Sequence, residues 1–235
     1  MDYALPKKIQ MMVSQAKWQL QAEHSVLVLV GVVQLREQAH FQHSDLADHL
    51  LQVCEKAKAL DITVLQLHAE PPMQTMLQLG EYVSQGRQLV IAGLISPMLK
   101  QLIEHISSIS SQICVINDAI LLDSQAQHIQ YINRLVQQGL QHMSSQTLRR
   151  LWTLSAPSHY ILSDQGILLA LAEQLQLNPL DIDPYTDLRH YGLDSVSMVS
   201  LIGLWRANGA HIDYEFFSQH CTLAEIFIRL KATPS

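Results

Sequence analysis

Four short apolar runs, each separated from the next by a stretch with helical periodicity, constrain what the first 145 residues can fold into. The runs are nearly continuous and rich in leucine and β-branched residues, which is typical of parallel strands buried on both faces. They lie at 26–33, 62–67, 89–94 and 113–116, and the helical patterns lie at about 44–60, 73–85, 97–109 and 125–140. Because strands that alternate with helices are joined by crossovers, the sequence predicts an α/β domain with a parallel sheet flanked by helices.

From about residue 164 onward the pattern changes, and helical periodicity is interrupted by one long acidic loop. The helical stretches cover about 165–177, 196–205 and 223–231, and the loop contains three aspartates, Asp181, Asp183 and Asp187. We therefore expect an all-α domain of four helices at 164–235, preceded by the α/β domain at 1–147 and a linker at 148–163. Three apolar residues suggest that part of this linker packs against a domain: Leu151, Trp152 and Leu154.

One serine stands at the junction between the acidic loop and the next helix. The chain reads Tyr191-Gly192-Leu193-Asp194-Ser195-Val196, and the glycine can adopt the backbone angles that a tight turn into a helix needs. The amides of the first turn and the positive end of the helix favour a phosphate attached to Ser195. The alternative is that Asp194 and Ser195 merely cap a helix, as Asp-Ser before an apolar run usually does.

The G-L-D-S motif followed by a hydrophobic residue resembles the attachment site of thiolation carrier proteins. The resemblance implies that a phosphopantetheinyl transferase moves 4′-phosphopantetheine from coenzyme A onto Ser195, within a loop that includes Gly192, Leu193 and Asp194. In such a step Ser195 Oγ attacks the β-phosphate of coenzyme A, and the transferase supplies magnesium and the base. The attached arm would then hold an acyl group as a thioester.

A longer pattern resembles the aryl carrier domains of catecholate siderophore synthesis. It consists of Ser195-Val-Ser-Met-Val-Ser-Leu-Ile-Gly-Leu-Trp205-Arg206 and a later Ile212-Asp213-Tyr214. The resemblance implies a cargo of 2,3-dihydroxybenzoate or salicylate, supplied by a stand-alone aryl-acid adenylating ligase. A condensation or cyclisation domain of a non-ribosomal peptide synthetase would accept it.

The same resemblance implies an apolar patch that faces partner proteins, formed by Val196, Val199 and Tyr214. The alternative is that one or more of these side chains belong to the core. Trp205 lies at helical spacing from Met198, Leu201 and Ile202, which indicates a core residue whatever its value as a family marker.

The first domain resembles isochorismate hydrolases, so the whole chain is similar to bifunctional isochorismatase–aryl carrier proteins. The residues that carry this resemblance are the start Tyr3-Ala-Leu-Pro6, the stretch Arg87-Gln-Leu-Val-Ile-Ala-Gly-Leu94, the stretch Val115-Ile-Asn-Asp-Ala119, and the helix from His128 to Leu135. Hydrolases of this family commonly self-associate, so the resemblance also implies a homodimer.

The groups that catalyse hydrolysis in that family are missing here. Val32 stands where the family has its acid/base aspartate, and a valine can neither accept nor deliver a proton. The segment that carries the family's lysine is shortened to 68–88, no lysine occurs between Lys58 and Lys100, and Lys100 falls at the position that is often cysteine. We expect a truncated isochorismatase-like domain without catalytic residues. The alternatives are a bifunctional enzyme that still hydrolyses isochorismate, or a relocated site that draws on Glu70, Asp118, Asp123 and Lys100.

One histidine-rich segment has the residue types of a metal site: His40, His43, Asp45, Asp48 and His49. Helical spacing would allow a zinc ion there. Ser44, however, has the features of a helix N-cap with Asp45 and Asp48 in the first turn, so we expect no metal.

Composition bounds the location and the partners. A formal net charge of −6 and the absence of a basic run argue against nucleic acid. The longest apolar run, 26–33, is far shorter than the roughly 20 residues of a membrane span. The N-terminus lacks the apolar stretch of a secretion signal, and three widely spaced cysteines (Cys54, Cys114 and Cys221) fit a reducing compartment. We expect a cytoplasmic protein.

Overall fold

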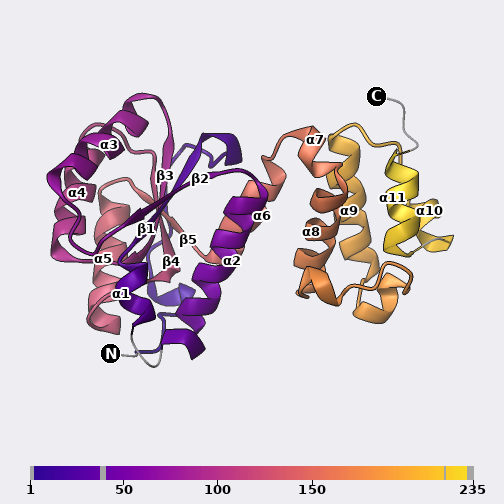
Figure 1. Cartoon of the computed structure of the whole chain (residues 1–235), viewed down its shortest axis with the longest axis horizontal. Helices are drawn as coiled ribbons and strands as arrows, with labels where there is room; N and C mark the ends of the chain where they lie inside the picture. The colour runs from indigo at the N-terminus through magenta and orange to yellow at the C-terminus, as the bar shows by residue number, and fades with distance from the viewer. Residues whose placement is uncertain (1–2, 38–40, 220, 232–235) are drawn as a thin grey trace. The chain divides into compact units, whose positions relative to one another are not determined.

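The computed structural model describes residues 3–37, 41–219 and 221–231. The chain divides into two compact units, residues 1–155 and 156–235. Figure 1 labels the helices and strands of both units.

The first unit is built on a five-stranded parallel sheet with the strand order β2-β1-β3-β4-β5. The strands are β1 (Ser25–Val30), β2 (Thr63–Leu67), β3 (Gln88–Leu94), β4 (Ile113–Leu121) and β5 (Gln141–Met143). The predicted parallel sheet flanked by helices is therefore confirmed. The fifth strand was not predicted, because Gln-His-Met at a sheet edge forms no apolar run.

The first strand is shorter than its apolar run. It ends at Val30, because Gly31 adopts the left-handed conformation (φ 62°) and Val32 begins the short helix α1 (Val32–Arg36). Val32 and Val33 are therefore helical residues beyond the carboxyl end of β1.

Helices cover both faces of the sheet (Figure 1). Helices α2 (Asp45–Ala59) and α6 (Ser145–Leu154) pack on one face. Helices α3 (Met73–Ser84), α4 (Pro97–Ser107) and α5 (Gln125–Gln137) lie on the other. Along β1, Val26, Val28 and Val30 face the second group and Leu27 and Leu29 face the first. The strands read as continuous apolar runs because both faces are buried.

Helix α6 belongs to the first unit. Leu148 and Trp152 are completely buried in the cluster that contains the inner residues of α2, and Trp152 Nε1 donates a hydrogen bond of 2.9 Å to Ser25 Oγ. Residues 148–154, expected from the sequence to be linker, are thus the end of a packed helix. The division between the units falls after Ser155.

The second unit is helical, as predicted. It contains α7 (Ser158–Ile161), α8 (Asp164–Leu175), α9 (Ser195–Ala207), α10 (Tyr214–Gln219) and α11 (Leu223–Lys231). Trp205 of α9 is completely buried and stacks on Phe217 of α10, with ring centroids 5.7 Å apart. The prediction that Trp205 is a core residue is confirmed. Tyr214 is the first residue of α10.

Candidate functional site

Ser195 is the first residue of α9, and the residue before it forms the helix cap. Asp194 has extended backbone angles, and its carboxylate accepts a hydrogen bond of 2.8 Å from the backbone amide of Ser197. This bond, followed by the interaction with the Ser197 side chain, holds the pKa of Asp194 below its usual value. Asp194 therefore performs the capping, and the hydroxyl of the exposed Ser195 takes no part in it.

Two residues hold Asp194 and Ser195 in place. Gly192 ends the short 3-10 helix η5 (Leu188–Tyr191) with φ 95°, a left-handed conformation that strains any residue with a Cβ. Leu193 is only 3% exposed, and its amide donates to the carbonyl of Leu188. A positive-φ turn followed by a buried leucine thus anchors the loop directly before the serine.

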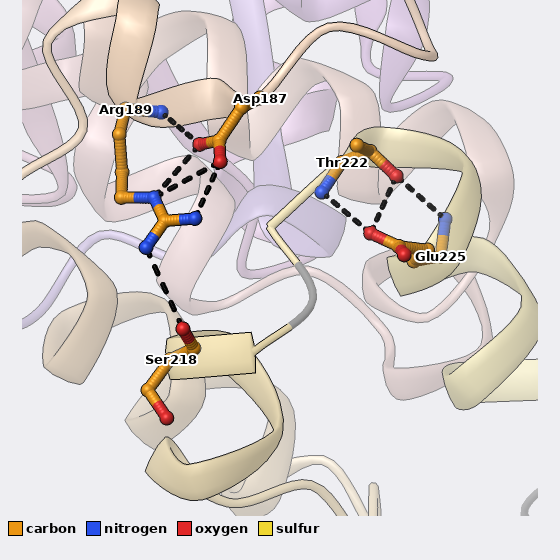
Figure 2. A network of polar contacts seen from close by, with 5 residues as sticks. All are labelled: Asp187, Arg189, Ser218, Thr222 and Glu225. Carbon is orange, nitrogen blue, oxygen red and sulfur yellow. Dashed lines mark hydrogen bonds and ion pairs between the residues drawn. The ribbon is translucent and has the colours of Figure 1, made fainter.

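An ion pair within the same loop orients an arginine that contacts α10 (Figure 2). The Arg189 guanidinium bonds both carboxylate oxygens of Asp187 and also reaches the backbone oxygen of Ser218 at the end of α10. The side-chain hydrogen bonds from Arg189 are the main cause that lowers the pKa of Asp187 to about 2. The sequence gives no signal for Arg189, because an Asp-x-Arg spacing within a loop is too common to indicate a pair.

The backbone makes a second connection at this point. The amide of Leu188 donates a hydrogen bond of 2.7 Å to the carbonyl of Cys221, and Asp187 forms an isolated β-bridge with Thr222. Thr222 and Glu225 form a reciprocal capping pair at the start of α11, visible in Figure 2. The loop that presents Ser195 is therefore fixed to the α10–α11 turn by both side chains and backbone.

Apolar side chains are exposed around the serine. Val196 is 75% exposed, Val199 is 58% exposed and Tyr214 is 47% exposed, so none of the three belongs to the core. Val196 and Val199 lie one turn apart on α9, and the Tyr214 hydroxyl donates to Ser195 Oγ at 3.5 Å. The structure thus brings Tyr214 beside the serine across 19 positions of sequence.

In the first unit, the carboxyl ends of β1 and β3 mark the point where the strand order reverses, which is where ligands bind in open α/β sheets. Apolar side chains lie close to Gly31 at this point. A Cβ at Gly31 would lie 3.0 Å from Leu94 Cβ and 3.3 Å from Ala69 Cβ, and Val32 packs against the apolar cluster under α2 and α6. Val32, the first residue of α1, is therefore a packing residue just beyond the end of β1.

The four candidate residues for a relocated active site are not joined to one another. The Asp118 carboxylate accepts bonds of 2.6 Å and 3.0 Å from the amide and hydroxyl of Ser145, at the start of α6. Lys100 Nζ lies over the ring of Tyr131, 5.6 Å from its centroid. Glu70 and Asp123 are exposed. No hydrogen bond or ion pair joins any two of these four residues, all of which lie in the described part of the chain.

The histidine-rich segment begins a helix. Ser44 accepts a bond from the amide of Ala47, with Asp45 and Asp48 in the first turn of α2, which confirms the predicted N-cap. Among the residues that the structure describes, no group of three or more His, Cys, Asp or Glu side chains could hold a metal ion. His40 lies outside the described residues.

Cys54, Cys114 and Cys221 are free thiols. No helix within residues 3–37, 41–219 and 221–231 has the length and apolar character needed to cross a membrane.

Comparison with known proteins bears on the second unit. Residues 165–227 match the family described as phosphopantetheine attachment site. The matched segment begins in α8, contains Ser195 and ends in α11. A comparison with curated proteins finds no match.

An exposed hydroxyl at a helix start, set apart from the capping carboxylate, fits a group attached through a phosphate ester. A domain of this kind is not itself catalytic; it depends on a transferase that attaches the group and on an adenylating enzyme that supplies the cargo. Residues 165–227 are therefore a carrier domain of the phosphopantetheine attachment site family, with covalently attached 4′-phosphopantetheine as its prosthetic group.

Proposed function

We propose that the protein is an aryl carrier, which holds 2,3-dihydroxybenzoate or salicylate for the non-ribosomal synthesis of a siderophore. The observation that carries the proposal is Ser195, an exposed hydroxyl at a helix start whose capping is performed by Asp194. The residues that follow, up to Trp205 and Arg206, and the later Ile212-Asp213-Tyr214 resemble aryl carriers more than other carriers.

Attachment requires one substitution at phosphorus. Ser195 Oγ forms a bond to the β-phosphorus of coenzyme A, the phosphoanhydride bond breaks, and adenosine 3′,5′-bisphosphate leaves. The serine proton passes to a base of the phosphopantetheinyl transferase. When bound, the group supplies a terminal thiol, to which a stand-alone aryl-acid adenylating ligase transfers the aryl group from an aryl adenylate made with ATP. The thioester forms, AMP leaves and the thiol proton is released. A condensation or cyclisation domain then accepts the aryl group.

Intact mass spectrometry tests the attachment and the cargo. The full chain is incubated with coenzyme A and a permissive transferase, and then with ATP, either aryl acid and an aryl-acid ligase. We expect the mass to increase by one arm and then by one aryl group, and both increases to vanish in Ser195→Ala. Ser200→Ala, which changes an exposed serine further along α9, is the matched control and should load normally.

The outcomes separate the parts of the proposal. An arm without aryl uptake would contradict the aryl cargo and leave a carrier for another acyl group. No mass increase in the wild-type protein would contradict attachment at Ser195 altogether.

We further propose that Val196, Val199 and Tyr214 face partner proteins. Their exposure beside Ser195 supports this role, since transient partners need only a small apolar patch. Val199→Asp should leave attachment of the arm intact and slow transfer of the aryl group to the condensation domain. Ile228→Asp, at a residue of α11 that is 70% exposed, is the control. Equal transfer rates for Val199→Asp and the wild type would refute the assignment.

For the first unit, we propose a non-catalytic isochorismatase-like domain that serves as a solubilising, dimerising or docking platform for the carrier. The apolar packing of Val32 and the separation of the four polar candidates support this reading. An isochorismate turnover assay on the full chain tests it: turnover above the uncatalysed rate would favour a bifunctional enzyme. Sedimentation analysis tests the homodimer.

The platform role has its own test. A fragment of residues 156–235 is compared with the full chain in aryl loading and in transfer to the condensation domain. Slower reactions of the fragment are expected, and equal rates would contradict a docking role.

A further inference from the structure

Tyr214 has a side chain that is fixed in direction although it is half exposed. It begins α10, where Asp213 Oδ1 accepts a bond of 2.9 Å from the amide of Phe216 and so fixes the start of the helix. Phe217, completely buried against Trp205, anchors the same helix from beneath. The hydroxyl of Tyr214 is thereby directed to Ser195 Oγ at 3.5 Å.

Two backbone amides at the start of α9, those of Val196 and Ser197, are already engaged. The Asp194 carboxylate accepts from the amide of Ser197 at 2.8 Å and also interacts with the amide of Val196. The Asp194 carboxylate therefore competes with a phosphate for these first-turn amides, which we expected from the sequence to favour the phosphate. It also places a negative charge close to the negative phosphate. Within the described residues, the Tyr214 hydroxyl is the side-chain donor that reaches Ser195 Oγ.

We propose that the Tyr214 hydroxyl donates a hydrogen bond to the phosphodiester formed at Ser195, and so positions the base of the phosphopantetheine arm. Attachment bonds a phosphorus atom to Ser195 Oγ. The charged oxygens on that phosphorus then lie next to the atom that the Tyr214 hydroxyl already approaches. A hydroxyl bonds a charged oxygen more strongly than a neutral one, at about 2.5–2.7 Å. Tyr214 is thus a positioning residue. The inference rests on the proposed attachment at Ser195.

Phosphorus NMR of the loaded full chain tests this contact without relying on activity. Wild type, Tyr214→Phe and Tyr185→Phe are each loaded with the arm, and loading is verified by intact mass. Tyr185 is the control because it is an exposed tyrosine of the same unit. The reference is the phosphorus chemical shift of each loaded protein unfolded in urea.

We expect the folded wild type and Tyr185→Phe to share one phosphorus chemical shift that differs from the reference, and Tyr214→Phe to move toward the reference. Tyr214→Phe keeps the ring, so the tryptophan fluorescence of the full chain should be unchanged. A loaded Tyr214→Phe protein with the wild-type phosphorus shift would overturn the role of Tyr214 and leave attachment intact. A wild-type protein that gains no arm would overturn both proposals.

Discussion

Single side chains decide how Ser195 is presented. Asp194 takes the capping role, Gly192 supplies the positive-φ turn, and Leu193 anchors the loop in the core. Because each of these tasks falls to another residue, Ser195 Oγ stays accessible to a transferase. Because Asp194 forms the cap, the proposed attachment at Ser195 would leave the helix cap intact.

His128 makes the free energy of unfolding of the first unit sensitive to acid. Its ring is completely buried. The Tyr3 hydroxyl accepts from the amide of Leu122 at 3.1 Å and forms a hydrogen bond of 2.8 Å with Nδ1 of His128. Burial lowers the pKa of His128 to about 4, against an opposing interaction with the backbone of Asn117. An unfolded histidine has a pKa of about 6.5.

The unfolded chain therefore binds a proton at a higher pH than the folded chain does. The contribution of His128 to the free energy of unfolding is complete above about pH 6.5 and is lost as the pH falls toward 4. Between pH 7.5 and pH 5, protonation of His128 in the unfolded chain lowers the free energy of unfolding by about 2 kcal/mol. Urea unfolding followed by far-UV circular dichroism at pH 7.5 and pH 5 measures it. His128→Gln should lose less stability over this interval, and an equal loss in both proteins would contradict the assignment.

At the scale of an element, α6 closes one face of the sheet. Its Trp152 fills the cluster under α2 and bonds Ser25, 127 positions away in the chain. Trp152→Ala should lower the free energy of unfolding of the first unit by about 3–5 kcal/mol, because it leaves a large cavity. Trp152→Phe keeps a ring but loses the bond to Ser25, and should cost about 1–3 kcal/mol.

Leu154→Ala, at the exposed end of the same helix, is the control and should be nearly neutral. Urea unfolding measures all three variants. If Trp152→Ala had no more effect than Leu154→Ala, α6 would not be part of the folded first unit.

At the scale of the whole molecule, the charge is concentrated in the carrier unit. Residues 156–235 contain nine acidic and four basic side chains, a formal net charge of −5 out of −6 for the chain. Association with a transferase of opposite charge should therefore be steered electrostatically. The rate at which the transferase loads Ser195 should fall as ionic strength rises from about 0.05 to 0.5 M, because the Debye length shortens.

Asp181→Asn removes one exposed charge from the loop before Ser195 and should weaken this salt dependence. Glu81→Gln removes an exposed charge from the first unit and serves as the control. A loading rate that is independent of salt would show that charge does not guide this encounter.

Local sequence patterns were sufficient for the parallel sheet, the helical second unit, the prosthetic group and the core role of Trp205. These features depend on apolar periodicity and on a short motif, which neighbouring residues specify. Strand β5 could not be predicted, because Gln141–Met143 becomes a strand only by pairing with β4. Three contacts could also be found only in the tertiary structure: the packing of α6, the ion pair between Asp187 and Arg189, and the approach of Tyr214 to Ser195. A local pattern indicates which side of an element is buried, whereas the distant residue that completes a contact is chosen by the fold.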